Sequence, residues 1–238
     1  MVVSKKFIPS LFTILNAICG FMSVISSSHG EYEQAIFFIF YAAVFDVLDG
    51  MVARILNTSS DFGVELDSLS DVVSFGFAPS FLLYSFFFKD YNAVGILVSS
   101  LVLAFGAIRL ARFNISLTGY TKDVFYGIPV PMAALVICSY VLFYHNKVFT
   151  PQLSEKFIFA LTILVSIMMV SKFRYPAMPS LSMKSIKSKP LIFILIFIGI
   201  VVSAVTKGYA IFPITILYVL FGIVNTFIPV KEKKKIKQ

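Results

Sequence analysis

Apolar residues dominate eight long stretches of the chain, and polar residues are mostly confined to the short segments between them. The stretches lie near residues 8–27, 33–56, 67–88, 92–113, 129–146, 157–171, 190–206 and 209–229. An α-helix needs about 20 mostly apolar residues to cross the hydrocarbon core of a bilayer. The pattern therefore predicts an all-α, polytopic membrane protein with about eight transmembrane helices. We expect a single integral-membrane domain over residues 1–238.

The composition agrees with a membrane location and excludes several classes of soluble protein. Of the 238 residues, 58% are hydrophobic and only 13% are charged, about half the charged share of an ordinary soluble domain. The segments between the stretches are too short for a separate soluble domain. A cytosolic globular enzyme, a secreted disulfide scaffold and a disordered protein are therefore excluded. Cys19 and Cys138 fall inside apolar stretches, where we expect small buried side chains without a disulfide.

Basic residues are distributed unevenly between the two sides of the predicted helix bundle. Alternating loops assign 16 of the 20 Lys and Arg residues to one side, and only Lys89, Lys147, Lys156 and Lys207 to the other. The positive-inside rule places the basic side, with both termini, in the cytoplasm. The net charge of +8 then indicates topology and attraction to anionic lipid rather than nucleic-acid binding. The basic side holds Lys5, Lys6, Arg54, Arg109, Arg112, Lys122, Lys172, Arg174, Lys184, Lys187, Lys189, Lys231, Lys233, Lys234, Lys235 and Lys237.

Four aspartates interrupt the second and third apolar stretches. Asp46 and Asp49 lie in the second stretch, and Asp67 and Asp71 lie at the start of the third. One aspartate at the centre of a membrane helix costs about 2.5–3.5 kcal/mol, so four of them need a compensating partner. At 100° per residue each pair shares one helix face, and the short loop 55–62 makes the helices antiparallel neighbours. We therefore expect the four carboxylates to converge between two helices, just below the cytoplasmic surface.

These carboxylates predict a site for divalent metal ions. Carboxylate oxygens without His or Cys nearby favour Mg²⁺, Mn²⁺ or Ca²⁺, and two such ions would balance four carboxylates. Gly50 and Gly63 leave open space beside the site, and Ala53 permits close approach of the helices. Solvated aspartates that cap helix ends are a poorer interpretation of two facing stripes. A divalent-cation transporter is a further interpretation, although Arg54 beside the site would repel a permeating cation.

The spacing of these residues resembles the signature of the CDP-alcohol phosphotransferase family. The segment 46–71 reads Asp-x2-Asp-Gly-x2-Ala-Arg-x8-Gly-x3-Asp-x3-Asp and matches all eight fixed positions. The resemblance implies that a hydroxyl attacks the lipid-side phosphate of a CDP-linked lipid and displaces CMP. It also implies a homodimer, a general base at Asp71, and two divalent cations, Mg²⁺ or Mn²⁺. The ligands that it implies for the cations are Asp46, Asp49, Asp67 and Asp71.

The same resemblance implies contacts to the nucleotide from Gly50, Arg54 and Gly63. The two glycines leave room for a flat pyrimidine, and the guanidinium offers a fork of donors to phosphate. Three further nucleotide candidates rest on position alone. They are Ser60 in the intervening loop and, one helical turn apart on the first stretch, Thr13 and Asn16, for which plain helix packing is an equal alternative.

Looser similarities concern the acceptor. The segments LARFN at 110–114, FYGIPVP at 125–131 and FRYP at 173–176 look like the membrane-integral phosphatidylserine synthases, as does IPSLFTILN at 8–16. Ser10 departs from an expected Asn, and Val130-Pro131 departs from the commoner Ser-Pro or Ile-Pro. This resemblance implies L-serine as the acceptor and CDP-diacylglycerol, or CDP-archaeol in an archaeal host, as the donor.

Three side chains are candidates to bind the serine acceptor. Arg112 and Arg174 are suited to its carboxylate, and Asn114 is suited to its amino group. A phosphorylated acceptor, such as glycerol 3-phosphate or inositol phosphate, stays open because Arg109 and Lys122 add further cations. Glycerol is another open alternative. The segment 173–189 is a candidate for a loop that covers the active site.

Overall fold

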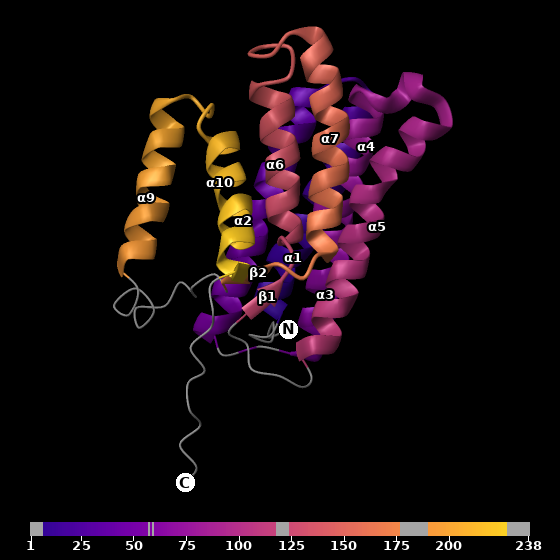
Figure 1. Ribbon diagram of the computed structural model, residues 1–238. Helices are drawn as coiled ribbons and strands as arrows, with labels where there is room; N and C mark the ends of the chain where they lie inside the picture. The colour runs from indigo at the N-terminus through magenta and orange to yellow at the C-terminus, as the bar shows by residue number, and fades with distance from the viewer. Residues whose placement is uncertain (1–6, 57, 59, 118–123, 177–189, 228–238) are drawn as a thin grey trace.

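The computed structural model describes residues 7–56, 58, 60–117, 124–176 and 190–227, and helices make up most of these ranges (Figure 1). Each of the eight predicted stretches contains a helix. The described residues also contain two short strands that were not predicted from the sequence. The elements are α1 (Phe7–Ser28), α2 (Tyr32–Leu56), α3 (Asp61–Asp71), the π-helical segment η1 (Val72–Phe77), α4 (Ala78–Phe86), the 3₁₀ segment η2 (Phe88–Tyr91), α5 (Asn92–Leu117), β1 (Val124–Tyr126), α6 (Val130–Phe143), α7 (Pro151–Val170), β2 (Arg174–Pro176), α9 (Pro190–Val205) and α10 (Ile211–Phe227).

The helices make this a multi-pass integral membrane protein. Within the described ranges, five helical segments are long and apolar enough to cross a bilayer: Ile8–Ser28, Tyr32–Leu56, Asp61–Phe86, Phe88–Ile115 and Pro151–Val170. Shorter apolar helices lie at Val130–Phe143, Ile192–Val205 and Ile211–Phe227. Many large apolar side chains are exposed on the outer faces of these helices. In a bilayer such apolar faces contact the lipid chains. The backbone N–H and C=O groups are hydrogen-bonded within each helix and need no water there.

Two helices begin earlier than the hydrophobic pattern predicted. The third stretch was expected to begin at residue 67, but α3 begins at Asp61, after the N-cap residue Ser60. The Gly63 amide donates to the Ser60 hydroxyl at 3.1 Å, which satisfies one of the free N–H groups of the first turn. Likewise α7 begins at Pro151 rather than near 157. Proline is favoured in a first turn because its missing N–H would be unpaired there in any case.

The two strands close the end of the bundle where α1 begins and α10 ends (Figure 1). They pair antiparallel, with Phe125 opposite Tyr175. The C-terminal helix α10 holds β2 in place. The Arg174 amide donates to Thr226 Oγ1 at 2.7 Å, and the buried Tyr175 hydroxyl donates to the Val219 carbonyl at 3.1 Å. Of the predicted covering loop 173–189, residues 177–189 lie outside the described residues.

Helix α9 stands beside α10, away from the other helices (Figure 1). The most extensive contact lies elsewhere, between α1 and α2, and α1 also packs against α3 and η1. Both cysteines are free and buried, as predicted. The arrangement places the aspartate-bearing part of α2 and α3 against α1 inside the bundle.

Candidate active site

Three carboxylates converge between α2 and α3. One carboxylate oxygen from each of Asp46, Asp49 and Asp67 lies within 4.8 Å of the other two. Asp49 is only 7% exposed, and Asp67 Oδ1 is buried without a hydrogen-bond partner. The two helices meet in this way because a connection of only a few residues joins the end of α2 to the start of α3.

Asp71 lies one helical turn beyond Asp67 and belongs to the same cluster of charges. It stands outside the group of three, but its charge interacts with the charges of Asp46 and Asp67. Its Oδ1 accepts a hydrogen bond of 3.2 Å from Asn16 Nδ2, and the side chain is 7% exposed. Asp71 is therefore a carboxylate beside the group of three, held in a fixed orientation by an amide from α1.

Helix α1 contributes a second donor. Thr13 Oγ1 donates to Asp49 Oδ2 at 2.9 Å, and Thr13 is itself buried. The sequence analysis gave Thr13 and Asn16 as nucleotide candidates or packing residues. In the structure the side chains of both residues donate hydrogen bonds to aspartate carboxylates. Donors of this kind fix the orientation of carboxylates that bind metal.

A close contact between α1 and η1 sets the position of Asn16. Ser74 Oγ donates to the Asn16 carbonyl at 2.8 Å. The neighbouring Gly20 has no room for a side chain, since an added Cβ would lie 2.5 Å from Ser74 Oγ and 2.7 Å from Ser74 Cα. The wider π-helical turn of η1 follows directly after Asp71. Such insertions often occur at functional sites, and the hydrophobic pattern gives no signal for one.

The cluster can bind metal ions. Its donors are hard oxygen atoms, which suit Mg²⁺ and Mn²⁺. Within the described ranges, none of the four aspartates forms an ion pair with Lys or Arg. Three carboxylates within 4.8 Å repel one another strongly in a setting with little water. The unpartnered Asp67 Oδ1 is thus an available ligand atom, and the residues fit a divalent cation.

A cavity of about 150 Å³ opens beside the carboxylates. At Gly50 an added Cβ would have only Arg54 Nη2 nearby, at 3.6 Å, so the glycine keeps this wall open. Arg54 bends back over the helix, and its Nε donates to the Gly50 carbonyl at 2.7 Å. Six predicted site residues line the cavity together: Thr13, Asp49, Gly50, Ser60, Gly63 and Asp67. The other lining residues were not among the predicted site residues; they are Pro9, Ser10, Ala53, Thr58 and Val64.

The three predicted acceptor residues do not line this cavity. Arg112 Nη1 donates to the Val170 carbonyl at 3.1 Å and so joins α5 to α7. Asn114 Nδ2 donates to Ser68 Oγ at 3.0 Å, on α3. Arg174 lies in β2, where its backbone is bound to α10. These contacts fix the elements around the site.

Arg109 of α5 also interacts with the cluster, and from the sequence it was considered only as a further cation for a phosphorylated acceptor. Its charge interacts with Asp71 and with Tyr218 of α10, and its Nε is buried without a partner. Arg109 lies almost one helical turn deeper in the apolar stretch than Arg112. An arginine at that depth is costly without a partner, and this was the signal available in the sequence.

Comparisons with known proteins agree on one family. Residues 6–171 match the family described as CDP-alcohol phosphatidyltransferase. Over 217 residues the chain is 37% identical to the CDP-diacylglycerol–serine O-phosphatidyltransferase of Helicobacter pylori, covering 91% of this chain and 90% of that protein. It is 42% identical over 171 residues to the archaetidylserine synthase of Methanothermobacter thermautotrophicus, covering 71% and 69%. A CDP-diacylglycerol–serine O-phosphatidyltransferase of Methanocaldococcus jannaschii is 32% identical over 214 residues, or 90% of each chain.

Proposed function

The chain belongs to the CDP-alcohol phosphatidyltransferase family, and we infer that it is a phosphatidylserine or archaetidylserine synthase. It transfers the phosphatidyl group of CDP-diacylglycerol, or the archaetidyl group of CDP-archaeol, to L-serine and releases CMP. The observation that carries this function is the 37% identity over 91% of the chain to a serine phosphatidyltransferase. The three converging carboxylates beside an open cavity supply a site suited to the reaction.

We propose that Asp46, Asp49, Asp67 and Asp71 hold two divalent cations, Mg²⁺ or Mn²⁺. Cations bound there would neutralise the diphosphate and stabilise the charge that develops on the departing CMP. Thr13 keeps Asp49 oriented by its hydrogen bond of 2.9 Å. The family signature and the oxygen-only donor set support this assignment.

The cavity walls suit the cytidine nucleotide. Gly50 and Gly63 lack the side chains that would fill the space, and both line the cavity. Arg54 at its edge offers a planar fork of N–H donors that fits phosphate oxygens. The hydroxyl of Ser60 accepts from Gly63 and holds the start of α3, so its role is to shape the nucleotide wall.

Asp71 is the proposed general base. The serine hydroxyl loses its proton to the Asp71 carboxylate while its oxygen forms a bond to the lipid-side phosphorus. The bond from that phosphorus to the oxygen of CMP breaks, and CMP leaves with the electron pair. Asn16 donates to Asp71 Oδ1, which leaves the other carboxylate oxygen to receive the proton.

Arg109 is the proposed partner of the serine carboxylate. It faces Asp71 and has a buried guanidinium nitrogen without a partner, so an acceptor bound there would lie beside the base. Arg112, Asn114 and Arg174 frame this side of the site through their contacts to α7, α3 and α10.

We further propose the orientation and the assembly. Both termini and the aspartates lie on the cytoplasmic side, because 16 of the 20 basic residues belong to that side. The protein is a homodimer, as the family resemblance implies. Light scattering of the purified protein in detergent tests the assembly.

The activity is tested by CMP release from purified protein in detergent. CDP-diacylglycerol or CDP-archaeol is supplied with Mg²⁺ or Mn²⁺, and acceptors are added one at a time. We expect release with L-serine, and loss of release when EDTA removes the metal. Release with glycerol 3-phosphate or inositol phosphate, but not with serine, would keep the metal site and contradict the acceptor. Metal-ion flux into liposomes without any CMP release would instead support the transporter alternative.

A further inference from the structure

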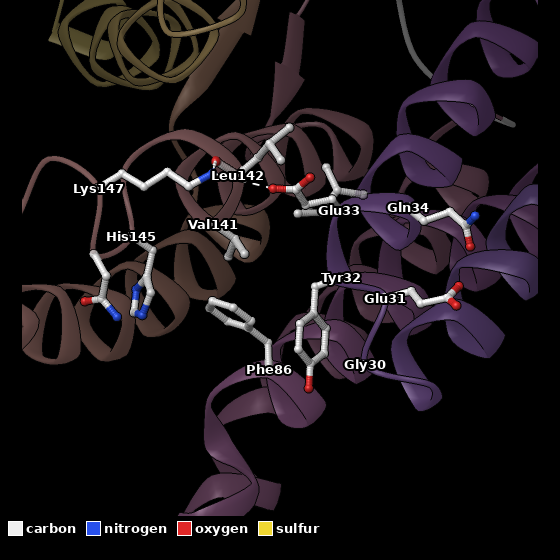
Figure 2. Close-up of a pocket in the computed structure, with 12 residues that line it drawn as sticks. Gly30, Glu31, Tyr32, Glu33, Gln34, Phe86, Val141, Leu142, His145 and Lys147 are labelled. Carbon is white, nitrogen blue, oxygen red and sulfur yellow. Dashed lines mark hydrogen bonds and ion pairs between the residues drawn. The ribbon is translucent and has the colours of Figure 1, made fainter.

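A second cavity, of about 710 Å³, lies between α2, α4 and α6 (Figure 2). Its walls come from the first turn of α2, the end of α4, and the end of α6 with the turn that follows. Tyr32 in its wall precedes Asp46 by 14 positions on the same helix, which corresponds to about 21 Å along the helix axis. The cavity is therefore separate from the catalytic cluster and lies near the opposite surface of the membrane.

The cavity is apolar on one side and charged on the other. Ile36, Val141 and Leu142 contribute buried apolar side chains. At the rim, Lys147 Nζ lies 3.7 Å from Glu33 Oε1, and both side chains are largely exposed, at 48% and 75%. Figure 2 shows this pair on one side of the cavity, with the rings of Tyr32 and Phe86 on the other.

The charges at the rim favour a ligand that carries both signs. Glu31, Glu33 and Lys147 give a net charge of −1, because burial lowers the pKa of His145 and keeps its imidazole neutral near pH 7. The Glu33 carboxylate can accept hydrogen bonds from a primary ammonium group, and the faces of Tyr32 and Phe86 also attract cations. Lys147 Nζ donates to the Leu142 carbonyl at 2.8 Å, and since its ammonium group has three N–H donors, it can also donate to a phosphate group beside Glu33.

We propose that this cavity binds the head group of a zwitterionic phospholipid that has a primary ammonium group. The ammonium group contacts Glu33, the phosphate contacts Lys147, and the upper part of an acyl chain packs on Ile36 and Val141. A volume of about 710 Å³ is within the usual range for sites that bind small molecules. The apolar wall and the position at the membrane surface favour a lipid over a water-soluble zwitterion.

Native mass spectrometry of the purified protein in detergent tests the site. Phosphatidylethanolamine, phosphatidylcholine and phosphatidylglycerol are added in equal amounts, and the bound lipids are counted. We expect phosphatidylethanolamine to be preferred over each of the others by about fivefold, as for one exposed charge contact. Free phosphoethanolamine at the same concentration should not compete.

Two variants assign the contacts, and one serves as a matched control. Glu33→Gln should remove the preference for phosphatidylethanolamine over phosphatidylglycerol, and Lys147→Gln should weaken binding of both lipids. Lys156→Gln removes an exposed cation on α7 that does not line the cavity, so lipid binding should not change. CMP release should be unaltered in all three variants, which shows that each is folded. Binding without a head-group preference, or a preference that both rim variants retain, would indicate an adventitious additive only and overturn the proposal.

Discussion

A hydrogen bond from Asn16 of α1 orients Asp71 of α3, the proposed general base. The amide of Asn16 donates to Asp71 Oδ1 at 3.2 Å. We expect Asp71→Asn to lower CMP release by about 10²–10⁴-fold, the usual contribution of a general base. Binding of the CDP-lipid should be largely retained, since Asp46, Asp49 and Asp67 still converge. Single-turnover CMP release and binding of radiolabelled CDP-diacylglycerol provide the two measurements. Turnover like that of the wild type would contradict the assignment of Asp71 as the general base.

The two arginines on α5 allow a direct comparison. Arg109 faces Asp71, whereas Arg112 is bound to the Val170 carbonyl. Lysine keeps the charge but loses the planar fork that matches a carboxylate. We expect Arg109→Lys to raise the KM for serine by about tenfold, as for one charge-assisted hydrogen bond, and to raise the KM for the CDP-lipid far less. Arg112→Lys is the matched control and should change both constants by a smaller factor. A larger serine effect at Arg112 would return that role to the residue that the sequence first indicated.

His145 gives the stability of the protein a dependence on pH. Its ring lies among Phe86, Phe87 and Tyr140, with centroid distances of 5.1, 5.7 and 5.8 Å, and burial lowers its pKa below 6.5. The unfolded chain binds a proton at a higher pH than the folded protein. The stabilising effect is therefore fully present above about pH 6.5 and falls as the pH decreases below it. We expect thermal unfolding in detergent to shift to lower temperature between pH 7.5 and 5.5. His145→Gln should reduce that shift, and an unchanged shift would contradict the assignment.

At the scale of elements, the contact between α1 and η1 holds the site together. Gly20→Ala would place a methyl group 2.5 Å from Ser74 Oγ, so we expect a loss of about 1–3 kcal/mol in stability, as for overpacking. Activity should fall as well, because Ser74 holds the backbone of Asn16. Gly199→Ala on α9 is the matched control, since its added Cβ would meet only Ile214 Cδ1 at 3.8 Å. Thermal unfolding and CMP release of both variants check this, and equal behaviour would contradict it.

The sequence was sufficient for the helices but not for how their ends fit together. Apolar stretches longer than the bilayer is thick predict helices directly, and the spacing of the four aspartates predicts a shared face. The strands β1 and β2 were missed because each has only three residues and pairs with a segment about 50 positions away. Arg109 was not predicted as a contact for serine, for a related reason. Its partners Asp71 and Tyr218 come from other helices, and spacing within α5 carries no information about them.

At the scale of the whole molecule, the two ends of the bundle differ in chemistry. The end with the aspartates also carries the paired strands and the arginines of α5. The opposite end carries the aromatic cluster around His145 and the Glu33–Lys147 ion pair. The residues 177–189 and 228–238, which hold half of the basic residues of the predicted basic side, lie outside the described residues. Orientation must therefore be tested at lysines whose positions the structure gives.

Lys172 and Lys156 serve that purpose. Both are exposed, Lys172 just after the end of α7 and Lys156 in its first turns, so they lie near opposite membrane surfaces. The native cysteines are buried and can be replaced by alanine before a single cysteine is introduced. By the positive-inside rule, we expect an impermeant maleimide to label Lys156→Cys in intact cells and to label Lys172→Cys only after permeabilisation. The reverse pattern would place the aspartates on the outer surface. CDP-linked substrates and CMP carry several charges and do not cross a bilayer freely, so that result would also contradict an active site supplied from the cytoplasm.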